Sequence, residues 1–94
     1  MDSFIPMSRS LVKFRLVYSQ TTFKEIKKLD SVAKKKLQKK ILFFQQNPLE
    51  NAKRLTGTNL GQYRWRVGSY RIIFDLEKNK ITILHIGHRK EIYK

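Results

Sequence analysis

Three arginines lie close together on two apolar segments that Gly68-Ser69 separates. A two-residue turn that begins with glycine joins antiparallel strands and fixes which residues face each other. In that register Arg66 faces Arg71, and Arg64 lies on the same face. Facing like charges destabilise a hairpin by about 0.2–1 kcal/mol, and an anion between them would reverse the sign. Guanidinium groups bind phosphate through two parallel hydrogen bonds. The pattern therefore predicts an exposed phosphate-binding surface; the alternative is arginines that splay apart into water.

The charge is the strongest global feature of the chain. Twenty-one Lys and Arg oppose seven Asp and Glu, which gives a formal net charge of +14 at pH 7. A chain this basic repels itself and is expected to have a polyanionic partner. Nucleic acid is the first candidate, a membrane surface the second and an acidic protein the third. Solubility alone is the weaker explanation.

The composition excludes several kinds of site. The chain has no cysteine, which rules out disulfides and cysteine–zinc sites. It shows no cluster of metal ligands, so we expect neither a metal nor a cofactor. No stretch approaches the roughly 18 apolar residues that a membrane helix needs, and the first residues lack the pattern of a secretory signal. We therefore expect a cytoplasmic protein that is not embedded in a membrane.

Hydrophobic periodicity divides the 94 residues into the elements of one domain. The expected elements are a loose arm over residues 1–11, a strand over 12–18, a helix capped by Ser19 or Thr22, a second helix from Asp30-Ser31 to Asn47-Pro48, a loop over 49–60, and strands over 62–67, 70–77 and 81–87. Thr22 and Glu25 have the spacing of a capping box. In the second helix, Ala33, Leu37, Ile41 and Phe44 form an apolar stripe.

The order β-α-α-β-β-β predicts an α+β fold. A helical hairpin should cover one face of a mainly antiparallel four-stranded sheet, within a single domain over residues 12–94. The apolar residues of the hairpin, Tyr63, Trp65, Val67, Tyr70, Ile72 and Phe74, should face the helices. His85 would lie opposite Ile72 on the buried side if the last turn has two residues, and on the other side otherwise. A structural role for His85 is favoured over a catalytic one.

Three segments resemble the RelE/ParE toxin superfamily. Residues 63–74 are similar to its central hairpin, and residues 53–57 are similar to the basic loop before that hairpin. The ending over residues 86–93 resembles more narrowly the RelE branch. The resemblance covers residues 13–94 and implies a RelE-like fold. It also implies a type II toxin that cuts messenger RNA in the ribosomal A site and is held inactive by an acidic antitoxin.

The resemblance also implies roles for individual residues. Arg64 and Arg66 would make basic contacts, Arg71 would bind a phosphate, Arg89 would support the leaving group or the transition state, and Tyr93 would stack on or orient a base. Further RNA-binding residues would be Lys53, Arg54, His88 and Lys90. His88 occupies a position at which members of the superfamily vary.

RNA carries its own nucleophile, the 2′-hydroxyl, so the expected reaction is metal-independent and gives a 2′,3′-cyclic phosphate and a 5′-hydroxyl. Arginine suits charge stabilisation but not general base work, because it stays protonated. His88, Glu91 or a ribosomal group could take the proton. Two rival functions share the fold: a ParE-type poison of DNA gyrase, and a non-catalytic module that binds RNA or the ribosome.

Overall fold

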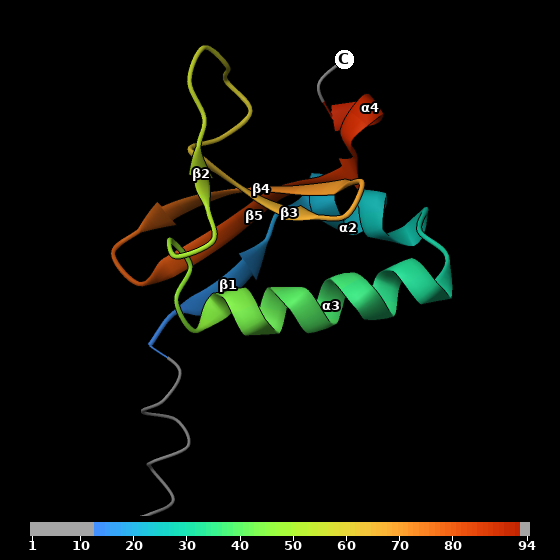
Figure 1. Ribbon diagram of the computed structural model, residues 1–94, viewed down its shortest axis with the longest axis horizontal. Helices are drawn as coiled ribbons and strands as arrows, with labels where there is room; N and C mark the ends of the chain where they lie inside the picture. Colours follow the sequence, from blue (N-terminus) through green and yellow to red (C-terminus); the bar gives the residue numbers. More distant parts are fainter. Residues whose placement is uncertain (1–12, 93–94) are drawn as a thin grey trace, which may run out of the picture.

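The computed structural model describes residues 13–92, which form a five-stranded sheet with helices packed on it (Figure 1). The elements, in chain order, are β1 (Arg15–Tyr18), α2 (Gln20–Lys27), α3 (Ser31–Gln45), β2 (Lys53–Arg54), β3 (Tyr63–Val67), β4 (Tyr70–Glu77), β5 (Lys80–His88) and α4 (Arg89–Ile92). The strand order is β1-β5-β4-β3-β2, and β1 pairs with β5 in parallel while the other pairs are antiparallel.

The predicted α+β fold is confirmed, with two additions. The loop expected over residues 49–60 contains the short strand β2, which adds a fifth strand to the sheet. The expected tail contains the helical turn α4. The arm predicted over residues 1–11 lies outside the described residues, as does Tyr93.

The core lies between α3 and one face of the sheet. The predicted stripe of α3 is buried, and so are the apolar residues Trp65, Ile72 and Phe74 of the central hairpin. Tyr63 and Tyr70 are partly buried at the margin of this cluster. The ring centroids of Trp65 and Phe74 lie 4.0 Å apart, and the indole N–H of Trp65 donates to the Pro48 carbonyl at 2.8 Å. A buried polar group is thereby satisfied, so Trp65 serves the core.

Ser19 begins α2, and Asp30 begins α3, as N-cap residues. The Ser19 hydroxyl accepts from the Thr22 N–H, and the Asp30 carboxylate accepts from the Ala33 N–H. The predicted capping box of Thr22 and Glu25 is wrong. The Thr22 hydroxyl donates to the Ile83 carbonyl on β5, and the Glu25 carboxylate accepts from a backbone N–H of the same strand.

The register of β5 contains a β-bulge. Phe74 pairs with Ile83, whereas Ile73 pairs with His85, so Leu84 is the extra residue. Leu76, Asp75 and Phe74 keep the pairing that a two-residue turn gives, but the bulge reverses the alternation beyond them. His85 therefore faces the side opposite the core, and Ile86 takes the buried position opposite Ile72.

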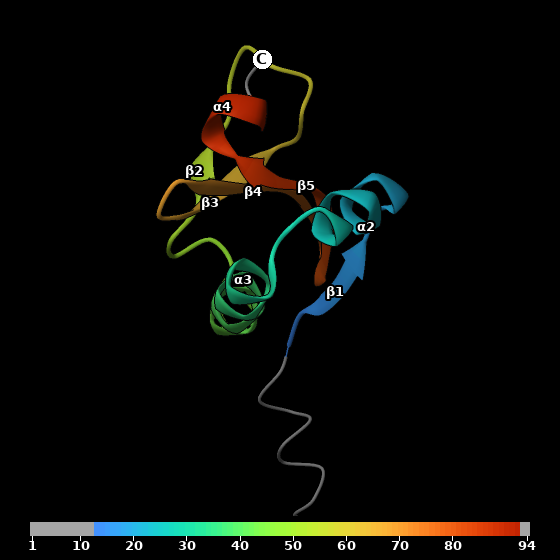
Figure 2. The ribbon, with the colours of Figure 1, turned by 90° about the vertical axis from the view of Figure 1, so that its right-hand side faces the viewer.

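Different elements cover the two faces of the sheet (Figure 2). In both ribbon views α3 lies below the sheet, while the loop between β2 and β3 and the helix α4 rise on the other side. The helix α2 lies beside β5, with which it makes extensive contact. The upper surface of the sheet, which carries the arginines, thus lies on the same side as this loop and α4.

Candidate nucleic-acid interface

The register of the β3–β4 hairpin brings the predicted arginines onto one face. Val67 pairs with Tyr70 and Arg66 with Arg71, as the two-residue turn predicts, and Gly68 has a φ of +59°. On β2, Lys53 pairs with Arg64 and therefore lies on the same face. We call the surface formed by Lys53, Arg64, Arg66 and Arg71 the arginine face.

Arg71 is not open to solvent, contrary to the predicted exposed surface. The residue is only 5% exposed, and its guanidinium donates to the carbonyls of Gly68 at 2.9 Å and of Tyr70 at 3.0 Å. Burial of a cation is tolerated when hydrogen bonds of this kind satisfy it. Arg71 thus stabilises the Gly68-Ser69 turn, and it is the buried member of the arginine face.

Arg64 and Arg66 differ in exposure. Arg66 is exposed, so it can move away from the buried Arg71 and reach a ligand. Arg64 is partly buried, and its Nε lies buried without a hydrogen-bond partner among residues 13–92. A buried guanidinium N–H without an acceptor is costly and rare in folded proteins. An anion bound at the arginine face would supply the missing acceptor.

The Gly68-Ser69 turn also contacts the first residue of α4. The Arg89 N–H donates to the Ser69 carbonyl at 2.8 Å, which places the first residue of α4 next to the hairpin end, and the Arg89 side chain is exposed. Lys90 is exposed on the same helical turn. The predicted leaving-group residue and the arginine hairpin are therefore neighbours.

His88 lies on the other side of β5. It pairs with Tyr70, and the two rings meet edge to face with centroids 6.0 Å apart. Strand alternation puts His88 on the face of Ile86, away from Gly87 and Arg71. Its Nδ1 accepts from the Lys90 N–H at 3.3 Å. The structure therefore does not bring His88 onto the arginine face.

The loop between β2 and β3 forms a wall beside the arginine face. A Cβ atom at Gly61 would lie 2.6 Å from Ile73 Cγ2, so only glycine fits where the loop closes onto the sheet. The Gln62 N–H donates to the Asp75 carboxylate at 2.8 Å, and the Gln62 side chain accepts from the Leu76 N–H at 2.9 Å. These contacts fix the base of the wall.

Two predicted RNA-binding residues lie at the other end of this loop. Lys53 and Arg54 are both exposed on the edge strand β2. The Arg54 guanidinium lies 5.8 Å from the centre of the Tyr63 ring and within 3.4 Å of its hydroxyl. Because Arg54 pairs with Tyr63 rather than Arg64, it points away from the arginine face.

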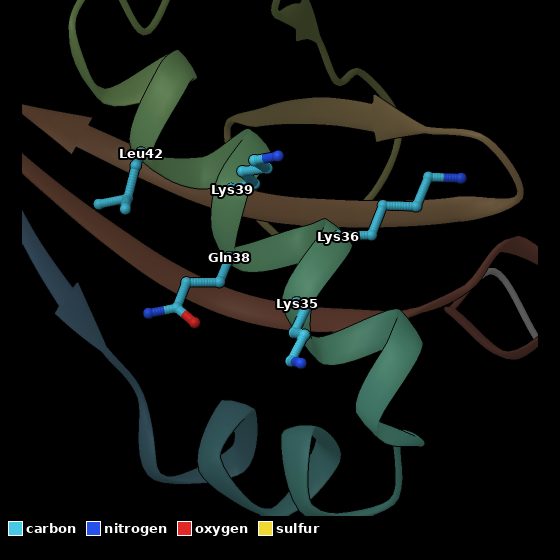
Figure 3. Close-up of a pocket in the computed structure, with 5 residues that line it drawn as sticks. All are labelled: Lys35, Lys36, Gln38, Lys39 and Leu42. Atoms are coloured by element: carbon cyan, nitrogen blue, oxygen red, sulfur yellow. The ribbon is translucent and has the colours of Figure 1, made fainter.

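The lysines of α3 form a second basic surface, on the far side of the core. Figure 3 shows that Lys36 and Lys39 extend to the side of β3 and β4, whereas Lys35 extends toward α2. These side chains line a shallow hollow of about 550 Å³ together with Gln38 and Leu42. All three lysines are exposed, as a solvated helix face should be. The buried stripe of α3 lies between Lys35, Lys39 and the arginine face, whereas the Lys36 ammonium reaches the hairpin turn, 3.5 Å from the place of a Cβ at Gly68.

Two polar residues that the sequence did not assign to a site meet at the edge of β5. The Glu25 carboxylate accepts from the Ile86 N–H at 2.8 Å through one oxygen, and its other oxygen lies 3.2 Å from His85 Nδ1. They border a groove of about 480 Å³, whose lining includes Leu60, Gly87 and Ile92. The sequence singled out Glu25 through its helical spacing from Thr22, but that spacing predicted a helix cap rather than a contact with His85.

Residues 13–92 contain no group of three or more His, Asp or Glu side chains that could hold a metal ion. In the same part of the chain, no helix is long and apolar enough to cross a membrane.

The fold is that of RelE toxins from toxin–antitoxin complexes. A chain of the complex RelBE2 from Mycobacterium tuberculosis matches with a TM-score of 0.75 and 21% identity, covering 83% of this chain and 100% of that one. A chain of the RelB–RelE complex from Methanococcus jannaschii matches with a TM-score of 0.65 and 27% identity, covering 82% and 94%. The intact RelBE complex of E. coli gives a TM-score of 0.67 and 24% identity, covering 80% and 95%. No curated protein sequence matches significantly.

The family model described as the ParE toxin of the type II toxin–antitoxin system, parDE, matches residues 14–93. The chain therefore belongs to the RelE/ParE superfamily of type II toxin–antitoxin toxins.

Proposed function

We propose that this toxin is a ribosome-dependent endoribonuclease that cleaves messenger RNA in the A site and so blocks translation in the cytoplasm. The observation that supports it most directly is the register that puts Arg64, Arg66 and Arg71 on one face of the sheet. Arg89 begins α4 beside the turn of the same hairpin. These four arginines would offer their guanidinium groups to a sugar-phosphate chain that lies on this face.

The proposed reaction uses the RNA's own nucleophile and needs no metal. The 2′-hydroxyl attacks the adjacent phosphorus, and the products are a 2′,3′-cyclic phosphate and a 5′-hydroxyl. Arg66 and Arg64 bind the phosphate, and the buried charge of Arg71 stabilises the extra negative charge from beneath. Arg89 supports the leaving oxygen. Tyr93, which lies outside the described residues, is proposed to orient a base. Lys53 and Lys90 are proposed to hold the RNA backbone beside the arginine face, and Arg54 and His88, which point away from that face, to hold it beyond the face.

An acidic antitoxin is the proposed protein partner. The matched RelBE structures are toxin–antitoxin complexes, and a net charge of +14 favours a partner rich in Asp and Glu. A partner that covers the arginine face would inhibit the toxin in a hetero-oligomer. Association with such a partner should be fast and strongly salt-dependent.

Poisoning of DNA gyrase is the second candidate, because the matching family model describes ParE toxins. That activity needs protein contact rather than an RNA site. The convergence of arginines on one sheet face favours the ribonuclease. A non-catalytic module that binds RNA or the ribosome would use the same charges without cutting.

Primer extension on translated messenger RNA separates these functions. The purified toxin should produce cuts within codons at the A site, and Arg66→Ala and Arg89→Ala should abolish them and relieve growth arrest. Lys13→Ala, at an exposed lysine outside the strands and helices, is the matched control and should leave the cuts in place. Inhibition of supercoiling without cuts would establish the gyrase poison, and ribosome binding without cuts would establish the non-catalytic module.

A further inference from the structure

The arginine face lacks a group that could take the proton of the 2′-hydroxyl. Its guanidinium and ammonium groups are donors only, and arginine stays protonated in proteins. An acceptor must therefore come from a neighbouring element. On the same face, the residue next to Gly87 in the alternation of β5 is His85.

The β-bulge at Leu84 gives His85 this position. Without the extra residue, His85 would point into the core opposite Ile72. Bulges often occur next to active sites, where they redirect a side chain. Here α2 holds the bulge: the Ser19 hydroxyl donates to the Leu84 carbonyl at 3.1 Å, and the Thr22 hydroxyl donates to the Ile83 carbonyl at 2.9 Å.

Glu25 fixes the orientation of the His85 ring. One carboxylate oxygen is held by the Ile86 N–H at 2.8 Å, and the other lies 3.2 Å from His85 Nδ1. A carboxylate at this distance keeps the proton on Nδ1 and leaves the lone pair on Nε2. The His85 side chain is 31% exposed, so the ring is accessible. A carboxylate that orients an imidazole in this way is the arrangement of a general base.

His85 is also a diagonal neighbour of Arg71 in the sheet. Gly87 lies directly opposite Arg71, and His85 is two residues from Gly87 along β5. Diagonal neighbours of this kind in a sheet are about 7–8 Å apart. His85 and Gly87 both line the groove of about 480 Å³. No residue of the arginine face lines this groove, so a bound nucleotide would place its ribose in the groove and its phosphate at the border of the arginine face, across Gly87.

The other acceptors near the groove fit less well. His88 also lines the groove, but it alternates onto the core side of β5, and its Nδ1 already accepts from the Lys90 N–H, which leaves the ring proton on Nε2. In that state His88 is a donor. Glu91 is exposed on α4, and no described group orients its carboxylate.

We propose that His85 is the general base of the cleavage reaction and that Glu25 is its positioning residue, an inference that rests on the proposed ribonuclease function. His85 Nε2 removes the proton from the 2′-hydroxyl as the 2′-oxygen bonds to phosphorus. The bond between phosphorus and the 5′-oxygen breaks, and the 5′-oxygen takes a proton from water. The proton on His85 then returns to solvent.

The test is single-turnover cleavage of messenger RNA in stalled ribosome complexes. His85→Arg is the decisive variant, because arginine can still pair with Glu25 but cannot accept a proton. We expect the rate at saturating ribosomes to fall by about 10²-fold or more, the usual contribution of a general base. Half-saturation and the melting temperature should stay close to those of the wild type. Glu25→Gln should also slow cleavage, because its amide can donate to Nδ1 and force the wrong tautomer.

Chemical rescue supplies a second readout. Imidazole added to His85→Ala should restore part of the cleavage rate, whereas imidazole added to Arg66→Ala should not. Wild-type rates in His85→Arg, or the absence of rescue in a folded His85→Ala, would overturn the role of His85. If the wild type itself makes no cuts on ribosomes, the proposed ribonuclease function fails instead.

Discussion

Replacement of Arg66 by glutamine should stabilise the free toxin while it weakens RNA binding. Arg66 faces Arg71 across the hairpin, and Arg71 is held in place by bonds to two backbone carbonyls. The pair lies one residue beyond the turn-closing pair Val67 and Tyr70, so it is a non-hydrogen-bonded pair with a short Cα separation of about 4.5 Å. Because its hydrogen bonds hold the Arg71 guanidinium in place, Arg71 cannot move away to reduce the repulsion.

The size of the effect can be estimated from Coulomb's law for an assumed separation of about 7 Å between the two guanidinium groups. Two unit charges about 7 Å apart repel by about 0.6 kcal/mol in water and by about 2.4 kcal/mol at an effective dielectric constant of 20. Because Arg66 is exposed, the lower end applies, which agrees with the ~0.2–1 kcal/mol typical of facing pairs. For a domain of this size, about 0.5–1 kcal/mol raises the melting temperature by roughly 2–8 °C.

Thermal unfolding at low salt measures this difference. Lys13→Gln is the matched control: Lys13 is exposed, and it belongs to no strand or helix. It should change the melting temperature little. Salt should reduce the gain of Arg66→Gln through screening, and a short single-stranded RNA should stabilise the wild type more than the variant. A variant less stable than the wild type at low salt, or an equal gain in Lys13→Gln, would refute the reasoning.

Three further predictions concern stability. Trp65→Phe leaves the buried Pro48 carbonyl without its donor and should lower the free energy of unfolding by about 1–3 kcal/mol in urea titrations. Gly61→Ala places a methyl group 2.6 Å from Ile73 Cγ2, so it should cost about 1–3 kcal/mol and slow cleavage by displacing the loop wall. Burial raises the pKa of Tyr18 above its ordinary value of 10.0, so the stability it contributes is complete below that pH and is lost as pH rises through the higher folded value. Tyr18→Phe should therefore lose less stability above about pH 10 than the wild type, as urea titrations at two pH values would show.

The register of the arginine hairpin could be predicted from the sequence because it depends on local features. Gly68 accepts the positive φ of the turn, and the alternation on both sides of it then leaves one pairing that buries Trp65 and Ile72 together. The cap at Asp30 was predictable for the same reason. Interactions between residues close in sequence leave a readable pattern.

The burial of Arg71 and the position of His85 depend on contacts between distant residues. Arg71 alternates correctly for an exposed face, yet carbonyls of its own turn bind its guanidinium and it is buried. The bulge at Leu84 depends on hydroxyls of Ser19 and Thr22 more than 60 residues away. Glu25 matched a local capping rule, but its carboxylate instead accepts from the Ile86 N–H at the unpaired edge of β5. Sequence periodicity shows only the local pattern, so it cannot indicate where a contact with a distant residue replaces a local one.

The two basic surfaces should contribute to different steps. Lys35 and Lys39 of α3 lie across the core, which contains Trp65 and Leu37, from the arginine face, so we expect the arginines rather than these lysines to touch the reacting phosphate. Exchange of Lys35 and Lys39 for glutamine should weaken ribosome binding and reduce its salt dependence, because fewer counterions are released. At saturating ribosomes the single-turnover cleavage rate should match the wild type, whereas Arg64→Gln should slow it even there. A slower saturated rate in the lysine variant would mean that α3 contributes to the chemical step. The assignment of ribosome binding to the α3 lysines and of catalysis to the arginine face would then be wrong.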